Sequence, residues 1–146
     1  MILKPSTSPL TVKSILPNYL QYENGANRTI AVTNSQRTGS PTGAKDFIRG
    51  VATIPNKCQP GRLSLKLENV PREGSYWVLA LGPKVNGLYQ WSIVSDMNAA
   101  TLFILARDVA KFKSKYETVV LRKATELGFV DVKRPLPSYQ GRDCVY

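Results

Sequence analysis

Three strand-like segments follow one another between residues 74 and 108, and they limit the possible fold more than any other feature. The segments 74–81, 88–96 and 100–108 are short, apolar and rich in aromatic or β-branched residues, and Gly, Asn or Asp bounds each of them. Such runs predict an antiparallel meander. Each run is apolar at both odd and even positions, whereas a strand with one solvated face would alternate. Both faces of this part of the sheet must therefore be covered.

The sequence predicts a helix directly after these strands. Apolar residues recur at helical spacing from Phe112 to Leu127, with lysine, arginine and glutamate on the other side. Gly128 follows the last turn as a C-cap residue would. We expect one amphipathic helix from Val109 or Lys111 to Leu127. This helix can cover one of the two apolar faces.

Further strand signals lie before residue 74. They occupy the ranges 10–16, 19–23, 29–33, 46–54 and 62–68. A Gly/Asn turn joins the second of these to the third, and residues 36–45 have the composition of a loop. Gly50 lies inside a strand, where a bulge or a close backbone approach is expected. The range 62–68 alternates cleanly between leucine and polar residues.

About seven strands in hairpin order and one helix predict an all-β fold. We expect an up-and-down antiparallel β-barrel, because closure removes exposed strand edges, with the helix packed on it. Residues 1–17 are predicted to be a tail or a degenerate first strand. Residues 18–146 are predicted to be one domain, with the helix at about 111–127 followed by a C-terminal tail.

Composition excludes several classes of protein and site. The sequence has 20 basic and 10 acidic residues, a net charge of +10, and the basic residues are spread along the chain. A solvated basic surface is the simpler interpretation, and nucleic acid or an anionic surface is the alternative. No histidine is present, which argues against a zinc site or a histidine base. No window approaches the ~18 apolar residues of a membrane-spanning helix, and no secretion signal is expected at the start of the sequence.

The combined motifs resemble the lipocalin family. The segments 76–81, 89–94 and 102–107, followed by a helix ending in Leu127-Gly128-Phe129, are most similar to the branch with apolipoprotein D and the bacterial and plant lipocalins. The resemblance covers roughly residues 18–130. The family carries a Gly-x-Trp motif in its first strand, and its tryptophan packs under the arginine that corresponds to Arg107. No tryptophan precedes Trp77 here, so the first strand is either missing or replaced by residues 8–16.

The resemblance implies a role for each apolar face. One face would line a calyx that binds a small hydrophobic molecule such as a fatty acid, retinoid, sterol or pigment. The implied lining residues are Leu63, Leu65, Leu67, Tyr76, Val78, Ala80, Ser92, Val94, Phe103 and Leu105. The implied residues on the outside, under the helix, are Trp77, Leu79, Trp91, Ile93, Leu102 and Ile104. The alternative is that the lining residues fill a packed barrel core.

We expect a carrier without catalytic residues, cofactor or metal. A lipocalin-like enzyme acting on a lipid or carotenoid is the first alternative, against which the absence of histidine and of paired carboxylates on neighbouring strands argues. A basic barrel that binds nucleic acid is the second. Its aromatic residues would be interleaved with Lys and Arg, whereas here they lie in apolar strands.

Three further features concern covalent bonds, location and partners. The resemblance implies a disulfide between Cys58 and Cys144, with two free thiols as the alternative. Asn27-Arg28-Thr29 is an N-glycosylation sequon on a predicted turn. Together these features and the resemblance predict a secreted protein. The helix carries Lys111, Lys113, Lys115, Arg122 and Lys123, a basic face that is either solvated or in contact with an anionic membrane or acidic partner.

Overall fold

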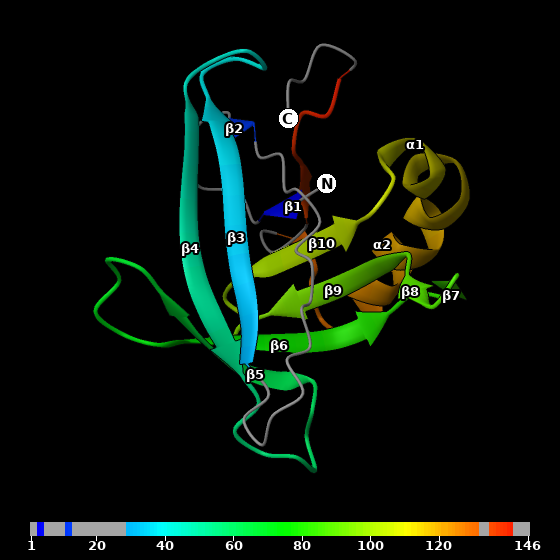
Figure 1. Ribbon diagram of the computed structural model, residues 1–146. Coiled ribbons are helices and arrows are strands. Elements are labelled where there is room, and N and C mark those ends of the chain that lie inside the picture. Colours follow the sequence, from blue (N-terminus) through cyan, green and yellow to red (C-terminus); the bar gives the residue numbers. More distant parts are fainter. Residues whose placement is uncertain (1–2, 5–10, 13–28, 132–134, 142–146) are drawn as a thin grey trace.

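A curled antiparallel sheet with one helix forms the described part of the computed structural model, residues 3–4, 11–12, 29–131 and 135–141 (Figure 1). The strands are β1 (Leu3–Lys4), β2 (Thr11–Val12), β3 (Thr29–Thr38), β4 (Lys45–Thr53), β5 (Arg62–Leu67), β6 (Gly74–Leu81), β7 (Lys84–Val85), β8 (Leu88–Tyr89), β9 (Trp91–Ser95), β10 (Leu102–Ala106) and β11 (Leu136–Pro137). The helical segments are α1 (Val109–Lys111), the π-helical segment η1 (Phe112–Tyr116) and α2 (Glu117–Glu126).

The seven-stranded main sheet has the order β10-β9-β6-β5-β4-β3-β2, and every neighbouring pair is antiparallel. Figure 1 shows the long strands β3 and β4 running across the direction of β6, β9 and β10, so the sheet curls strongly along its length. The expected all-β class, with strands in hairpin order and one C-terminal helix, is confirmed. In the described residues, β10 and β2 are the two edges of this sheet.

The N-terminal segment contributes two short strands at separate places. Thr11 and Val12 pair with Thr38 and Arg37 at the edge formed by β3. β1 pairs with β11 and lies beside β10, at the opposite edge of the main sheet. Part of the predicted range 10–16 is thus a strand. The predicted strand 19–23 lies outside the described residues.

The β3–β4 hairpin is longer than the sequence predicts. Residues 36–38 were expected to be loop, but Gln36 pairs with Asp46 and Arg37 with Lys45. The Gln36 amide also donates to the Asp46 carboxylate at 3.2 Å, and Arg37 Nη1 donates to the Gly43 carbonyl at 2.8 Å. Polar cross-strand contacts extend the pairing of β3 and β4 beyond the apolar residues. The periodicity of apolar residues alone does not reveal this extension.

Gly50 confirms the predicted close approach of two backbones. It pairs with Leu67 on β5, and a Cβ atom at position 50 would come within 2.3 Å of the Lys66 carbonyl oxygen. Glycine is therefore required here for β4 and β5 to pair.

The helix begins and ends close to the predicted positions. The Asp108 carboxylate accepts a hydrogen bond from Lys111 N at 2.9 Å as the N-cap. At the other end Gly128 has φ +89°, its N–H donates to Thr125 O, and Phe129 N–H donates to Ala124 O at 3.0 Å. These two bonds define a Schellman motif, so the predicted glycine C-cap is confirmed.

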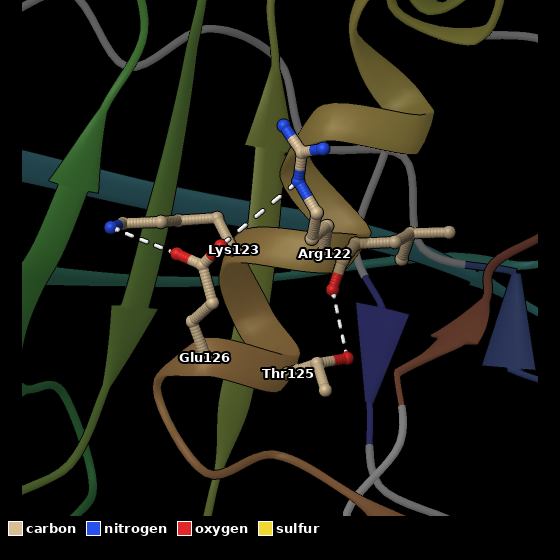
Figure 2. Close-up of polar contacts among 5 residues, drawn as sticks. Arg122, Lys123, Thr125 and Glu126 are labelled. Carbon is tan, nitrogen blue, oxygen red and sulfur yellow. Dashed lines mark hydrogen bonds and ion pairs between the residues drawn. The ribbon is translucent and has the colours of Figure 1, made fainter.

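At the C-terminal end of the helix, an acidic residue lies beside two residues of the basic face. Figure 2 shows Glu126 between Arg122 and Lys123, with the Thr125 hydroxyl turned toward the turn above it. Lys123 Nζ lies 3.2 Å and Arg122 Nε 4.0 Å from the Glu126 carboxylate. Both pairs are exposed, so they contribute little to stability. They do offset the positive charge at this end of the helix.

The helix packs on one face of the sheet, which we call the helix face. Ile93, Leu102 and Ile104 of the sheet are buried there. Their partners from the helix and the residue after its cap are Phe112, Tyr116, Val120, Ala124 and Phe129. Leu79 and Trp91 pack against the same cluster, as expected. One of the two apolar faces is therefore covered by the helix.

Trp77 departs from the expected position under the helix. It pairs across the strands with Arg62, whose guanidinium lies 4.2 Å from the centre of the indole ring. It is not part of the cluster beneath the helix. Trp77 therefore lies on the same side of the sheet as the helix but contacts Arg62 through a cation–π interaction.

No helix within the described residues is both long and apolar enough to span a membrane.

Candidate functional site

Strand register places all but one of the predicted lining residues on the face opposite the helix, which we call the inner face. Leu63 pairs with Tyr76, and Val94 pairs with both Val78 and Phe103. Directly paired residues have side chains on the same face, and every second residue along a strand shares it. The inner face therefore contains Leu63, Leu65, Leu67, Tyr76, Val78, Ser92, Val94, Phe103 and Leu105.

The inner face also includes residues from β3 and β4 that were not predicted as lining. Val32, Ala52 and Leu63 form a buried cluster, and Ile30 and Ile54 pack against it as partly buried residues. Leu65, Tyr76 and Val78 join the same cluster. The four strands β3 to β6 thus contribute one continuous apolar surface.

The signal that could have found these residues is alternation. In the segment 29–33, Ile30 and Val32 alternate with threonine and alanine, which indicates one buried face. Ala52 is a small residue and contributes little to an apolar pattern. It is nevertheless almost completely buried, since it pairs with Ile30 on one side and Leu65 on the other.

Ala80 is the exception, and its predicted place on the inner face is wrong. Val78 pairs with Val94, but Ala80 pairs with Ile93, so the ladder between β6 and β9 shifts by one residue at Leu79. This is a β-bulge, in which two residues of one strand oppose one residue of the other. Leu79 and Ala80 consequently both pack against the helix-face cluster.

Tyr76 is the titratable side chain of the inner face whose environment is most unusual. Burial raises the pKa of its hydroxyl above the ordinary value of 10.0. No group in the described residues forms a hydrogen bond with this hydroxyl. Buried tyrosine hydroxyls usually have a partner. The inner face thus combines apolar side chains with one polar group that is open to a further contact.

The described side chains do not gather into a metal site. No three Cys, Asp or Glu residues in the described part of the chain lie together as ligands of one ion. The chemistry that the predicted lining residues on the inner face offer is burial of apolar surface, with the hydroxyls of Tyr76 and Ser92 as their polar groups. Such a surface can bind an apolar molecule and orient one polar end of it.

Of the remaining predicted sites, Cys58 lies within the described residues. Cys58 is exposed in the turn between β4 and β5, has no disulfide partner within the described part, and its N–H donates to the Asn56 side chain at 2.9 Å. Cys144 and Asn27 lie outside the described residues. The disulfide and the glycosylation site therefore stay predictions.

Comparison with known proteins gives one family. A search of curated proteins finds no match. The sequence profile of the lipocalin-like domain matches residues 10–134, which include every strand of the main sheet, from β2 to β10, and the whole of the helix. The match thus spans both the inner face and the helix face. On this evidence the chain belongs to the lipocalin-like domain family.

Proposed function

We propose that this protein binds and carries a small hydrophobic molecule on the inner face of its sheet. A lipocalin-like fold suggests in general that such a ligand is bound. The observation that supports the proposal most is the inner face itself, where the apolar side chains of β3 to β6 surround a tyrosine hydroxyl that has no partner among the described residues. A ligand with a long apolar body and one polar end fits this pattern. Fatty acids, retinoids and sterols have that chemistry, as do apolar pigments with a polar group.

An approximate free-energy balance sets an upper limit on the affinity for such a ligand. Burying a chain of about 12 methylenes gains on the order of 10 kcal/mol, at ~0.8 kcal/mol for each. Association itself costs ~4 to 15 kcal/mol. The difference is at best about 6 kcal/mol, which corresponds to a dissociation constant of roughly 10 to 100 μM or weaker, as for a carrier that must also release its ligand.

We propose a carrier and not an enzyme. Among the lining residues named above, the polar side chains are the hydroxyls of Tyr76 and Ser92, so those residues contain no acid–base pair. If Cys58→Ser abolished the conversion of a lipid or carotenoid without unfolding the protein, the enzymatic alternative would replace this proposal.

We also propose that the protein is secreted, on the basis of the family, the sequon at Asn27 and the cysteine pair.

Ligand titration with a matched pair of variants tests the proposal. Leu65 and Lys66 are neighbours on β5, with Leu65 on the inner face and Lys66 exposed on the opposite side. Saturable quenching of tryptophan fluorescence by at least one member of a panel of fatty acids, retinoids and sterols is expected. Leu65→Phe fills part of the binding surface and should weaken that binding about tenfold, a loss of ~1.4 kcal/mol. Lys66→Phe should leave it unchanged.

Two results would contradict the proposal. The first is a folded protein that saturates with no member of the panel. The second is equal loss of affinity in Leu65→Phe and Lys66→Phe, because that would place the ligand elsewhere. Native mass spectrometry of freshly purified protein adds an independent measurement, since a carried ligand appears as added mass that Leu65→Phe reduces.

A further inference from the structure

A small hairpin between β6 and β9 exposes apolar side chains that the inner face does not use. Its two strands, β7 and β8, form a separate two-stranded sheet in which Lys84 pairs with Tyr89 and Val85 with Leu88. Val85, Leu88 and Tyr89 are exposed, and so is Leu81 just before the hairpin. Val85 and Leu88 share one face of the hairpin, and Tyr89 lies on the other face beside Lys84. Exposed apolar side chains gathered on one small element indicate an interaction site.

The hairpin has a defined shape. Asn86 and Gly87 both have positive φ, 50° and 77°, as a tight two-residue turn requires. Gln90 N–H donates to the Pro83 carbonyl at 3.1 Å and closes the base of the hairpin. Arg107 Nε donates to the Tyr89 carbonyl at 2.7 Å, which ties the hairpin to the end of β10. The apolar residues are therefore held in place.

Basic side chains surround the hairpin. Lys84 Nζ lies 4.8 Å from the centre of the Tyr89 ring, and Lys111 Nζ donates to Gln90 Oε1 at 3.3 Å. Together with Arg107 these make three cations. The carboxylate of Asp108, next to Arg107 in the sequence, caps the helix. Within the described residues no ion pair neutralises any of the three, whereas Arg122 and Lys123 at the far end of the helix share Glu126.

We propose that the β7–β8 hairpin, with Lys84, Arg107 and Lys111 around it, docks on the surface of an anionic lipid bilayer. Apolar side chains that enter the headgroup region, an aromatic ring at the interface and adjacent lysine or arginine residues are the combination that binds such a surface. Neither part is sufficient alone, because a few apolar side chains or a few charges give only weak, reversible binding. This proposal does not depend on a ligand being bound at the inner face.

Sedimentation of the full chain with lipid vesicles tests the proposal. Binding to vesicles of phosphatidylcholine mixed with phosphatidylserine is expected, and binding to pure phosphatidylcholine should be much weaker. The difference in binding between the two kinds of vesicle should shrink at high salt. Leu88→Ser should weaken binding to the mixed vesicles about tenfold. Lys84→Gln combined with Lys111→Gln should weaken it about 25-fold, at roughly fivefold for each charge removed.

Matched variants on the outer side of β4 and β5 serve as controls. Val51 is exposed to 44% and Leu88 to 52%, so Val51→Ser removes a similar apolar surface elsewhere on the protein. Lys45→Gln combined with Lys66→Gln removes two exposed charges from the same side of β4 and β5, one of them, Lys66, directly paired with Val51. Both controls should bind the mixed vesicles like the unaltered protein.

Three outcomes overturn the proposal. The unaltered protein fails to sediment with the mixed vesicles, or Leu88→Ser sediments as well as it does, or the Val51 and Lys45/Lys66 controls lose binding instead. If the protein ignored the mixed vesicles but bound polyglutamate through Lys84 and Lys111, the hairpin would be a docking site for an acidic protein and the membrane proposal would be rejected.

Discussion

Gly82 lies directly against the ring of Trp91. Its N–H donates to the Trp91 carbonyl at 2.9 Å, and a Cβ atom at position 82 would come within 2.6 Å of the indole Cδ1 and Nε1 atoms. Trp91 in turn packs against the cluster beneath the helix. Position 82, directly after β6, therefore has no room for a side chain.

Gly82→Ala is expected to lower the free energy of unfolding by about 1 to 3 kcal/mol, because the added methyl group must displace the indole ring. Chemical denaturation measures the change, and the near-UV circular dichroism of the tryptophans should change with it. Gly74→Ala is the control, since its Cβ would meet only the Leu65 carbonyl oxygen at 3.9 Å. Equal effects of the two substitutions would contradict the predicted clash.

The helix offers two adjacent valines for a second test. Val120 is fully buried in the helix-face cluster, whereas Val119 is 50% exposed. Val120→Ala should lower the free energy of unfolding by about 2 to 3 kcal/mol through lost burial and a cavity. Val119→Ala should be neutral or slightly stabilising, because alanine favours a helix more than valine does. Urea denaturation compares them directly.

Tyr76 should give the protein a loss of stability at alkaline pH. Burial raises the pKa of its hydroxyl above 10.0 in the folded state, while the unfolded state keeps the ordinary value. The contribution to stability is therefore fully present below pH 10 and is lost as the pH rises through the folded pKa. Tyr76→Phe should remove this loss, and Tyr89→Phe, which changes an exposed tyrosine, should not. Denaturation midpoints measured below and above pH 10 distinguish the two.

Asp96 organises the turn between β9 and β10. Its carboxylate accepts hydrogen bonds from Thr101 Oγ1 at 2.6 Å, Asn98 N at 2.7 Å and Ala100 N at 3.2 Å. Burial acts to raise the pKa of Asp96, but these bonds outweigh it and hold the pKa below 3.8. The stabilisation is present above that value and is lost as the pH falls through the lowered pKa.

Asp96→Ala should therefore cost about 1 to 2 kcal/mol at neutral pH, an amount reduced by the exposure of the turn. The difference from the unaltered protein should shrink on acidification below pH 3.8. A stability difference that stays constant across this pH range would show that the charge of the carboxylate is not what holds the turn.

The predicted bond between Cys58 and Cys144 can be checked by intact mass. A disulfide lowers the mass by two hydrogens relative to the reduced protein, and closing so long a loop should stabilise the fold by about 4 to 5 kcal/mol in the chain-entropy model. Cys58→Ser should abolish the mass difference and the stabilisation together. Two alkylated cysteines in protein purified without reductant would contradict the bond.

The sequence was sufficient for the elements that a regular pattern describes. The range 74–81 is the strand β6 as predicted, and the helix ends at the predicted glycine. Both follow from local chemistry, namely turn residues, side-chain period and a C-cap. Apolar residues at both odd and even positions of the strands predicted that both faces of the sheet must be covered. They also predicted that the helix packs on one of these faces.

Other features depend on contacts that no local pattern reveals. The bulge at Leu79 lies in a run that is apolar throughout, so a shift of one residue changes nothing in the pattern. Trp77 turns to Arg62, which is distant in sequence. The hairpin β7–β8 is different, because Asn86-Gly87 is a strong hairpin signal that was present in the sequence and could have predicted it.

The bulge shifts the alternation of side chains along β6 by one residue. Tyr76 and Val78 before it belong to the inner face, whereas Leu79 and Ala80 both pack against the helix-face cluster. A substitution at Val78 or at its neighbour Leu79 therefore alters only one of the two cores. A change of ligand preference and a change of helix packing can thus be made separately, within a single strand of the same protein.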